Sequence, residues 1–301
     1  MGKSRTQMAL LSGSWPARIT WALLPLVVGP ALGDALATHS LAVARTGTVV
    51  AWGVWVVGLA AVVIPRAVSL TALRLAAPIV PLAAAWAATR SGRGGADVVA
   101  LAWSVLVVLA AFAPTTGDAF ANGSSYGDER RMLLRAPTPL LLGPIPLTWA
   151  LAVVAPVLGP ILLAAKAWVP GVVLLVVGLP FTALGSRALH GLSRRWVVFV
   201  PAGMVLHDLQ AMVDAVFFPR GTITRFGPAL DGAAADGEEP LDLTLGAVGL
   251  ILQLDLLEPR DVAPRRGRAP LDPIDVQHLR LAASRPGALL AEAQRRRIAV
   301  G

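Results

Sequence analysis

The stretch of sequence that decides the fold is residues 140–184, LLLGPIPLTWALAVVAPVLGPILLAAKAWVPGVVLLVVGLPFTAL. It holds two apolar runs, Leu140–Ala164 and Trp168–Leu184, and Lys166 between them marks the only polar break. A helix needs about 20 apolar residues to cross a hydrocarbon core of about 30 Å. The stretch therefore predicts two membrane-spanning helices joined by a tight hairpin.

Four more apolar runs precede this pair, and they are almost free of charged residues. They are Ile19–Leu36, Gly47–Ile64, Ala67–Ala88 and Val98–Ala113. The expected fold is a membrane all-α bundle of about six transmembrane helices over residues 19–190. Prolines inside these runs predict kinks, because each removes a helix hydrogen bond.

The composition agrees with this expectation. Of 301 residues, 55% are hydrophobic and 15% are charged, whereas soluble domains carry about 25% charged residues. The net charge of +8 raises nucleic acid as a partner, but basic loops beside an anionic leaflet explain the same excess. We expect membrane lipids as partners and no nucleic acid. The chain has no cysteine, which excludes disulfides and thiolate sites. Abundant Ala, Val, Arg and Gly are typical of a GC-rich bacterial genome.

The first 18 residues form a basic leader. Together with the run that follows they resemble a secretory signal, and Ala35-Leu36-Ala37 resembles its cleavage site. Because the leader is long and further spans follow, we expect an uncleaved first span that acts as the insertion signal.

Lysine and arginine in short loops predict the orientation, since they concentrate on the cytoplasmic side. With the N-terminus inside, the inner segments hold Lys3, Arg5, Arg18, Arg66, Arg74, Arg130, Arg131, Arg135, Arg187, Arg194 and Arg195. The outer loops hold Arg45, Arg90, Arg93 and Lys166. We therefore expect a multi-pass protein of the cell (cytoplasmic) membrane with both termini in the cytoplasm.

Polar residues that carry chemistry are sparse within the spans. Asp34 lies at the outer end of the first span, and no span centre holds a carboxylate or a histidine. An ionisable group inside the bilayer usually marks transport or catalysis. The absence of carboxylates and histidines from the span centres disfavours a proton-coupled transporter.

The inner loop over residues 115–137 is the most polar segment between spans. Asp118, Asp128 and Glu129 are weak candidates for chemistry, and residues 128–135 are expected to form a short interfacial helix with its arginines late, as the helix dipole favours. The lipid- or phosphate-binding candidates are Arg130, Arg131 and Arg135. The alternative is that these arginines only set the orientation.

The histidines predict no metal site. His207 adjoins Asp208, and His278 is expected to share a helix face with Asp275. Neither pair suffices to hold a metal, so no metal or other cofactor is expected.

After about residue 192 the apolar runs become short and rich in β-formers. Arg195–Val200 and Met204–His207 predict a hairpin around Pro201-Ala202-Gly203. Strands are expected at Ala215–Pro219, Leu241–Leu245 and Gly249–Leu257, with a turn or short helix at Gly221–Phe226. Helices are expected at Asp272–Ala283 and Pro286–Arg297, within an Arg-rich helical tail over residues 261–301.

A helix hairpin that leads directly into Ser193–Val205 resembles bacterial membrane proteins that carry a pleckstrin-homology-like domain. The resemblance covers residues 194–260 and implies a small cytoplasmic α+β domain with a bent antiparallel sheet, used for binding and oligomerisation. The whole chain resembles multi-span membrane proteins of actinobacteria.

Three functions follow as alternatives. The first is a non-enzymatic scaffold or regulatory membrane protein whose cytoplasmic domain binds a partner protein, a second copy of the chain or the membrane surface. The second is a transporter or permease-like protein. The third is a membrane enzyme acting on a lipid or envelope precursor through the 115–137 loop. No established catalytic set is visible, which favours the first.

Overall fold

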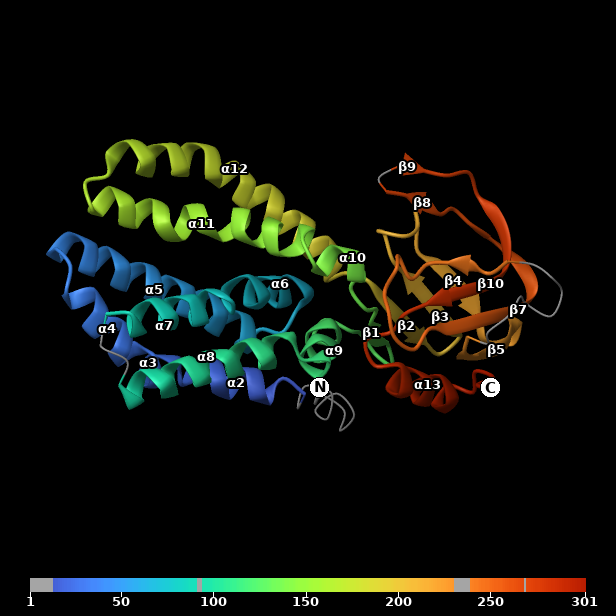
Figure 1. Cartoon of the computed structure of the whole chain (residues 1–301). Coiled ribbons are helices and arrows are strands. Elements are labelled where there is room, and N and C mark those ends of the chain that lie inside the picture. The colour runs from blue at the N-terminus through green and yellow to red at the C-terminus, as the bar shows by residue number, and fades with distance from the viewer. Residues whose placement is uncertain (1–12, 91–93, 230–238, 268) are drawn as a thin grey trace. The chain divides into compact units, whose positions relative to one another are not determined.

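The computed structural model describes residues 13–90, 94–229, 239–267 and 269–301. The chain divides into two compact units, residues 1–123 with 146–190 and residues 124–145 with 191–301. The first unit is helical and the second is rich in strands (Figure 1). Of the leader predicted over residues 1–18, residues 1–12 lie outside the described residues.

The helical unit is built from long apolar segments and short connections. Its helices are α2 (Trp15–Ala22), α3 (Leu24–Val27), α4 (Gly29–Ala37), α5 (Leu41–Val63), α6 (Ala67–Ala76), α7 (Ile79–Ala88), α8 (Gly95–Phe112), α9 (Pro114–Asn122), α11 (Pro144–Ala164) and α12 (Trp168–Leu192). Within the described residues, five helical segments are long and apolar enough to cross a membrane, judged by length and composition: α5, α6 with α7, α8, α11 and α12.

Five of the six predicted spans correspond to these five segments. The hairpin between the last two is confirmed: α11 and α12 run side by side (Figure 1), and Lys166 turns the chain with φ 62°. The run Ile19–Leu36 is instead broken into α2, α3 and α4. A proline lies in the first turn of each of these pieces, where its missing N–H costs no helix hydrogen bond.

Tryptophans join the helices of the first unit. Trp21 is fully buried, its indole N–H donates to the carbonyl of Trp55 at 2.9 Å, and the indole of Trp55 donates back to the carbonyl of Trp21 at 3.1 Å. Gly58 on α5 leaves room for the Trp21 ring. Trp103 donates to the carbonyl of Thr20 at 3.0 Å and so ties α8 to α2.

The second unit contains two four-stranded sheets. The first has the order β1-β2-β3-β4 and the second the order β5-β7-β10-β6. The strands of these sheets are β1 (Arg130–Leu133), β2 (Trp196–Val200), β3 (Gly203–His207), β4 (Val216–Pro219), β5 (Ile223–Pro228), β6 (Leu241–Asp242), β7 (Leu252–Val262) and β10 (Ile274–Leu281). All pairs are antiparallel except β6 with β10.

Short elements complete the second unit. They are the helix α10 (Thr138–Leu141), the 3₁₀ turn η1 (Arg220–Thr222), the hairpin of β8 (Arg265–Arg266) and β9 (Ala269–Pro270), and the helix α13 (Pro286–Arg295).

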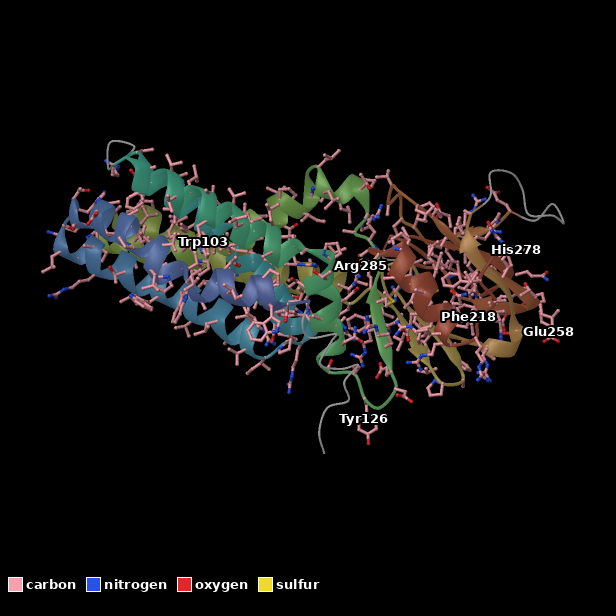
Figure 2. All side chains as sticks on the ribbon, turned by 90° about the horizontal axis from the view of Figure 1, so that it is seen from below. Trp103, Tyr126, Phe218, Glu258, His278 and Arg285 are labelled. Atoms are coloured by element: carbon pink, nitrogen blue, oxygen red, sulfur yellow. The ribbon has the colours of Figure 1, made fainter. Side chains whose placement is uncertain are left out.

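One hydrophobic core serves both sheets. Phe199 and Phe218 of the first sheet, Phe226 and Leu254 of the second, and Leu289 of α13 are all fully buried in it. Figure 2 shows Phe218 among the densely packed side chains of this unit. Burying large apolar side chains from every element is the main stabilising contribution to such a small unit.

Two helix predictions are wrong. Residues 130–133 form β1, not a helix, because Met132 and Leu134 enter the common core and β1 pairs with β2. Residues 274–281 form β10, not a helix, and pair with β7. The predicted hairpin is confirmed as β2 and β3, and the predicted last helix is confirmed as α13.

The sheet-rich unit is also larger than the predicted range of 194–260. It takes β1 from the loop between α9 and α11, and it takes β10 and α13 from the predicted Arg-rich tail. Gly221–Phe226, predicted as a turn or short helix, contains the end of η1 and then the start of β5.

Candidate functional site

The predicted site residues fall into both units. Asp34 is exposed on α4, and Asp118 is buried on α9, both in the helical unit. Asp128 and Glu129 belong to the sheet unit together with the three arginine candidates, Arg130, Arg131 and Arg135. The structure therefore brings together the residues over 128–135 and leaves Asp34 and Asp118 in a separate body.

Arg131 is held by protein groups. Its Nε donates to the Glu129 carboxylate at 2.7 Å, and its Nη1 donates to the Ser124 hydroxyl at 3.1 Å. The guanidinium also lies over the Trp196 ring, 5.3 Å from its centroid. Burial raises the pKa of Glu129, but the hydrogen bonds from Arg131 and the Tyr126 N–H outweigh it and lower that pKa overall.

The Trp196 ring continues into a short stack. It lies nearly parallel to the His207 ring, with centroids 5.4 Å apart and planes at 19°. Burial lowers the pKa of His207, and the positive charges of Arg194 and Arg131 lower it further, against the opposing charge of Asp208. This end of the first sheet therefore favours a neutral imidazole.

The other two arginine candidates also have partners. The Arg135 guanidinium donates to the carbonyl of Val248, and the backbone carbonyl of Arg135 accepts from Arg195 at 2.9 Å. Arg130 also interacts with other groups of the protein. A phosphate or headgroup at these arginines would therefore compete with existing protein contacts. Tyr126, at the tip of this loop, points away from the protein in Figure 2 and is exposed.

A second polar cluster, which the sequence did not predict as a site, crosses the second sheet. In the register of β5, β7 and β10, Arg225 and His278 both pair with Asp255, and Arg280 pairs with Gln253. These side chains alternate with the buried leucines of β7 and β10, so they share the opposite face of the sheet.

Asp255 is the centre of this cluster. One carboxylate oxygen accepts from His278 Nδ1 at 2.7 Å and from the Gln253 amide at 2.8 Å, and the other accepts from Arg225 at 3.4 Å. Burial raises the pKa of Asp255, but the hydrogen bonds from His278, Gln253 and Arg225 outweigh it and lower that pKa overall. Asp255 therefore stays ionised at neutral pH.

The Asp255 contact fixes the orientation of the His278 ring, which Figure 2 labels within the sheet unit. The other ring nitrogen, Nε2, is buried and has no hydrogen-bond partner within the described part of the chain. With Nδ1 donating to a carboxylate, a neutral ring offers Nε2 as a proton acceptor or a ligand nitrogen. A nucleophilic hydroxyl bonded to this nitrogen, the arrangement that covalent catalysis uses, is not found among the described residues.

Among the described residues, no group of three or more His, Cys, Asp and Glu side chains could hold a metal ion. Comparison with known proteins gives no lead: no family model matches the chain, and no curated protein or solved structure is detectably similar to it.

Proposed function

We propose that the protein is an integral protein of the bacterial cytoplasmic membrane whose sheet unit is a cytoplasmic, pleckstrin-homology-like binding module with a scaffold or regulatory role. Support for the membrane comes from the five long apolar segments and from what they expose. Val49 on α5, Val99 on α8 and Val176 on α12 are all more than half exposed. Exposed apolar side chains on long helices are favourable in contact with lipid.

The broken segment α2–α4 supports a sixth crossing. At one end, Gly13 accepts from the Thr116 hydroxyl at 3.5 Å, just beyond the end of α8. At the other end, the His39 and Trp86 rings are 5.7 Å apart, near the end of α7. The segment therefore runs the full length of α8 in the opposite direction. Six crossings would return both termini to the same side.

The orientation is proposed from charge. On the side where α6 begins and α8 ends, the helical unit carries Arg18, Arg66, Arg74 and Arg187, whereas Arg45, Arg90 and Lys166 lie toward the other side. The positive-inside rule then places the sheet unit in the cytoplasm.

The observation that carries the proposed role is the pairing of β1 with β2. Strand β1 belongs to the connection between α9 and α11, whereas β2 follows α12. Because α11 and α12 form a hairpin, the start of α11 and the end of α12 lie at the same end of that hairpin. The hydrogen bonds between Arg130–Leu133 and Trp196–Phe199 therefore join two helix connections in one sheet. A partner bound to that sheet would shift the conformational equilibrium of the helices. By linkage, a conformational change of the helices would alter the affinity of the sheet for the partner.

The fold expected from the resemblance supports a binding module. Two antiparallel meanders, β1 to β4 and β5, β7, β10, are followed by α13 packed on the common core. The resemblance implied a bent antiparallel sheet with a helix, used for binding and oligomerisation.

A thiol-labelling experiment tests the membrane part of the proposal. The chain has no cysteine, so Tyr126→Cys and Lys166→Cys each carry one thiol. In intact cells an impermeant maleimide should label Lys166→Cys and spare Tyr126→Cys. In inside-out vesicles the pattern should reverse. Labelling of both from outside intact cells would contradict the proposed topology.

Native mass spectrometry of the full chain in nanodiscs of its own membrane lipids tests the role. A retained protein partner or a defined oligomer supports the binding module. A retained lipid or envelope precursor that is lost in Arg130→Gln/Arg131→Gln, but kept in the exposed control Arg220→Gln, would support the enzyme alternative instead.

A further inference from the structure

The sheet unit carries an uncharged apolar tip next to the start of α11. Two segments form it, residues 136–143 and residues 246–251, and neither contains a charged residue. Leu142 is 89% exposed and Val248 is 63% exposed, and Leu141 and Leu250 are each about half exposed. Isolated exposed leucines are common on proteins, but an uncharged group of four on two adjoining segments requires an explanation.

The loop over residues 246–251 is fixed against the first segment by its backbone. The N–H of Val248 donates to the Thr138 hydroxyl at 3.0 Å, and the carbonyl of Val248 accepts from the Arg135 guanidinium. Gly249, at φ 113°, lies directly against that guanidinium, so a side chain there would displace it. The loop is therefore a built feature, and Val248 is held at the first residue of α10.

In the turn that leads into the loop, two backbone N–H groups form hydrogen bonds within the turn itself. The N–H of Gly246 donates to the Thr244 hydroxyl at 3.2 Å, and that of Ala247 donates to the Thr244 carbonyl at 3.1 Å. Leu245 adopts a left-handed conformation with φ 54°, followed by Gly246 with φ 77°. Bulky side chains rarely adopt this conformation, so the chain accepts local strain to turn Ala247 and Val248 in this way.

These features suit entry into a lipid interface. An unpaired backbone donor or a charge is costly in a region of low water content. The N–H groups of Gly246, Ala247 and Val248 are all paired, and the nearest charge at the tip is Arg135, whose long side chain can keep its head at the headgroup level.

Chain continuity indicates which surface the tip meets. Leu142 lies two residues before Pro144, where α11 begins. At no more than about 3.6 Å per residue, Leu142 is within about 7 Å of the end of that helix. If α11 crosses the membrane, as the proposed function requires, Leu142 lies at the interface and Val248 is fastened to the same short segment.

We propose that the apolar tip, Leu141, Leu142, Val248 and Leu250, inserts into the cytoplasmic lipid leaflet and fastens the sheet unit to the membrane surface. The inference rests on the proposed function, because it needs α11 to be a span. Through Val248 and Leu250 it adds an attachment of the sheet unit beyond its chain connections to the helices.

Single-cysteine variants of the full chain test the proposal. Val248→Cys, Leu250→Cys, Leu142→Cys and the control Leu271→Cys are each labelled with the fluorophore NBD and reconstituted into nanodiscs. Some of these nanodiscs contain lipids with a nitroxide near the headgroup end of the acyl chain. Leu271 is also an exposed leucine, 47% exposed, in the sheet unit. The control reports whether the fluorophore alone drives insertion.

The expected result is blue-shifted emission and nitroxide quenching at residues 248 and 250, comparable with residue 142, and little quenching at residue 271. Quenching at 142 with residues 248 and 250 behaving like 271 overturns this inference and leaves the proposed function standing. No quenching at 142 overturns the proposed function and the inference with it. Equal quenching at all four positions also overturns the inference, because the label then explains the result.

Discussion

The ion pair of Arg195 with Asp208 gives the strongest stability prediction. The two side chains are 2% and 0% exposed. Arg195 donates to the Asp208 carboxylate through Nε at 2.9 Å and through Nη2 at 2.8 Å. The carboxylate also accepts from the backbone N–H groups of Gln210 at 3.2 Å and Ala211 at 3.3 Å. The pair joins the end of β3 to the start of β2 in the sheet unit.

The perturbation is Asp208→Asn, which keeps the shape and removes the charge. A buried guanidinium left without its counter-charge costs about 3 to 5 kcal/mol. For a unit of this size, each kcal/mol corresponds to roughly 3 to 4 °C in the midpoint of thermal unfolding. We expect the midpoint of the sheet unit to fall by roughly 10 to 20 °C.

Hydrogen exchange of the full chain in nanodiscs locates the effect. Since each 1.4 kcal/mol is a factor of ten, amides of β2 and β3 should lose roughly 10²- to 10⁴-fold in protection, while those of α5 keep theirs. Glu129→Gln is the matched control. It breaks a pair whose side chains are each 20% exposed, and it should cost about 1 kcal/mol or less.

A double variant separates a pair effect from a packing effect. Arg195→Met/Asp208→Asn removes both charges, so its loss should be smaller than the sum of the two single losses. The reasoning is refuted if Asp208→Asn costs no more than Glu129→Gln, or if the two single losses simply add.

Two further predictions concern the other sheet and the bundle. The lowered pKa of Asp255 means that its stabilising contribution is complete at neutral pH and is lost as the pH falls through that folded-state value. The wild type should therefore lose its advantage over Asp255→Asn as the pH falls below about 4, and parallel pH profiles of thermal unfolding would contradict this. Gly58→Ala should cost about 1 to 3 kcal/mol by overpacking, because its methyl group would overlap the Trp21 ring. Gly53→Ala on the same helix meets nothing within 4 Å and should be neutral or slightly stabilising by thermal unfolding.

The helical segments could be predicted from sequence because a long apolar run leaves few alternatives. The ends of these segments could not be predicted. Helix α5 begins at Leu41, six residues before the predicted Gly47, and Ser40 caps it by accepting from the N–H of Val43 at 3.4 Å. Arg45 lowered the hydropathy of this turn without disfavouring a helix. Likewise the proline positions predicted that the first span would bend, but not that it would divide into three pieces.

Tertiary contacts decided the two wrong helices. Met132 and Leu134 supply buried side chains to a core whose other members come from residues 197–298, so residues 130–133 pair with β2 whatever their local charge order favours. In β10, Val276 and Leu279 are both buried although they are three residues apart, a spacing that also fits a helix face. The strand ladder is irregular at this point: between the pairs Val276–Arg260 and His278–Asp255, one residue of β10 faces four residues of β7, and such an irregularity breaks the alternation that identifies a strand.

Long-range strand pairing also explains why the polar cluster of the second sheet could not be found from sequence. A helix would have paired His278 with Asp275, one turn away. The strand pairs it with Asp255, 23 residues earlier in the chain. In β10 the side chains of Leu279 and Leu281 are buried, so His278 takes the opposite face of the sheet, where Asp255 lies beside it. The pairing of β5 and β10 with β7 is therefore the feature that assembles the cluster, and this pairing joins residues that lie far apart in the sequence.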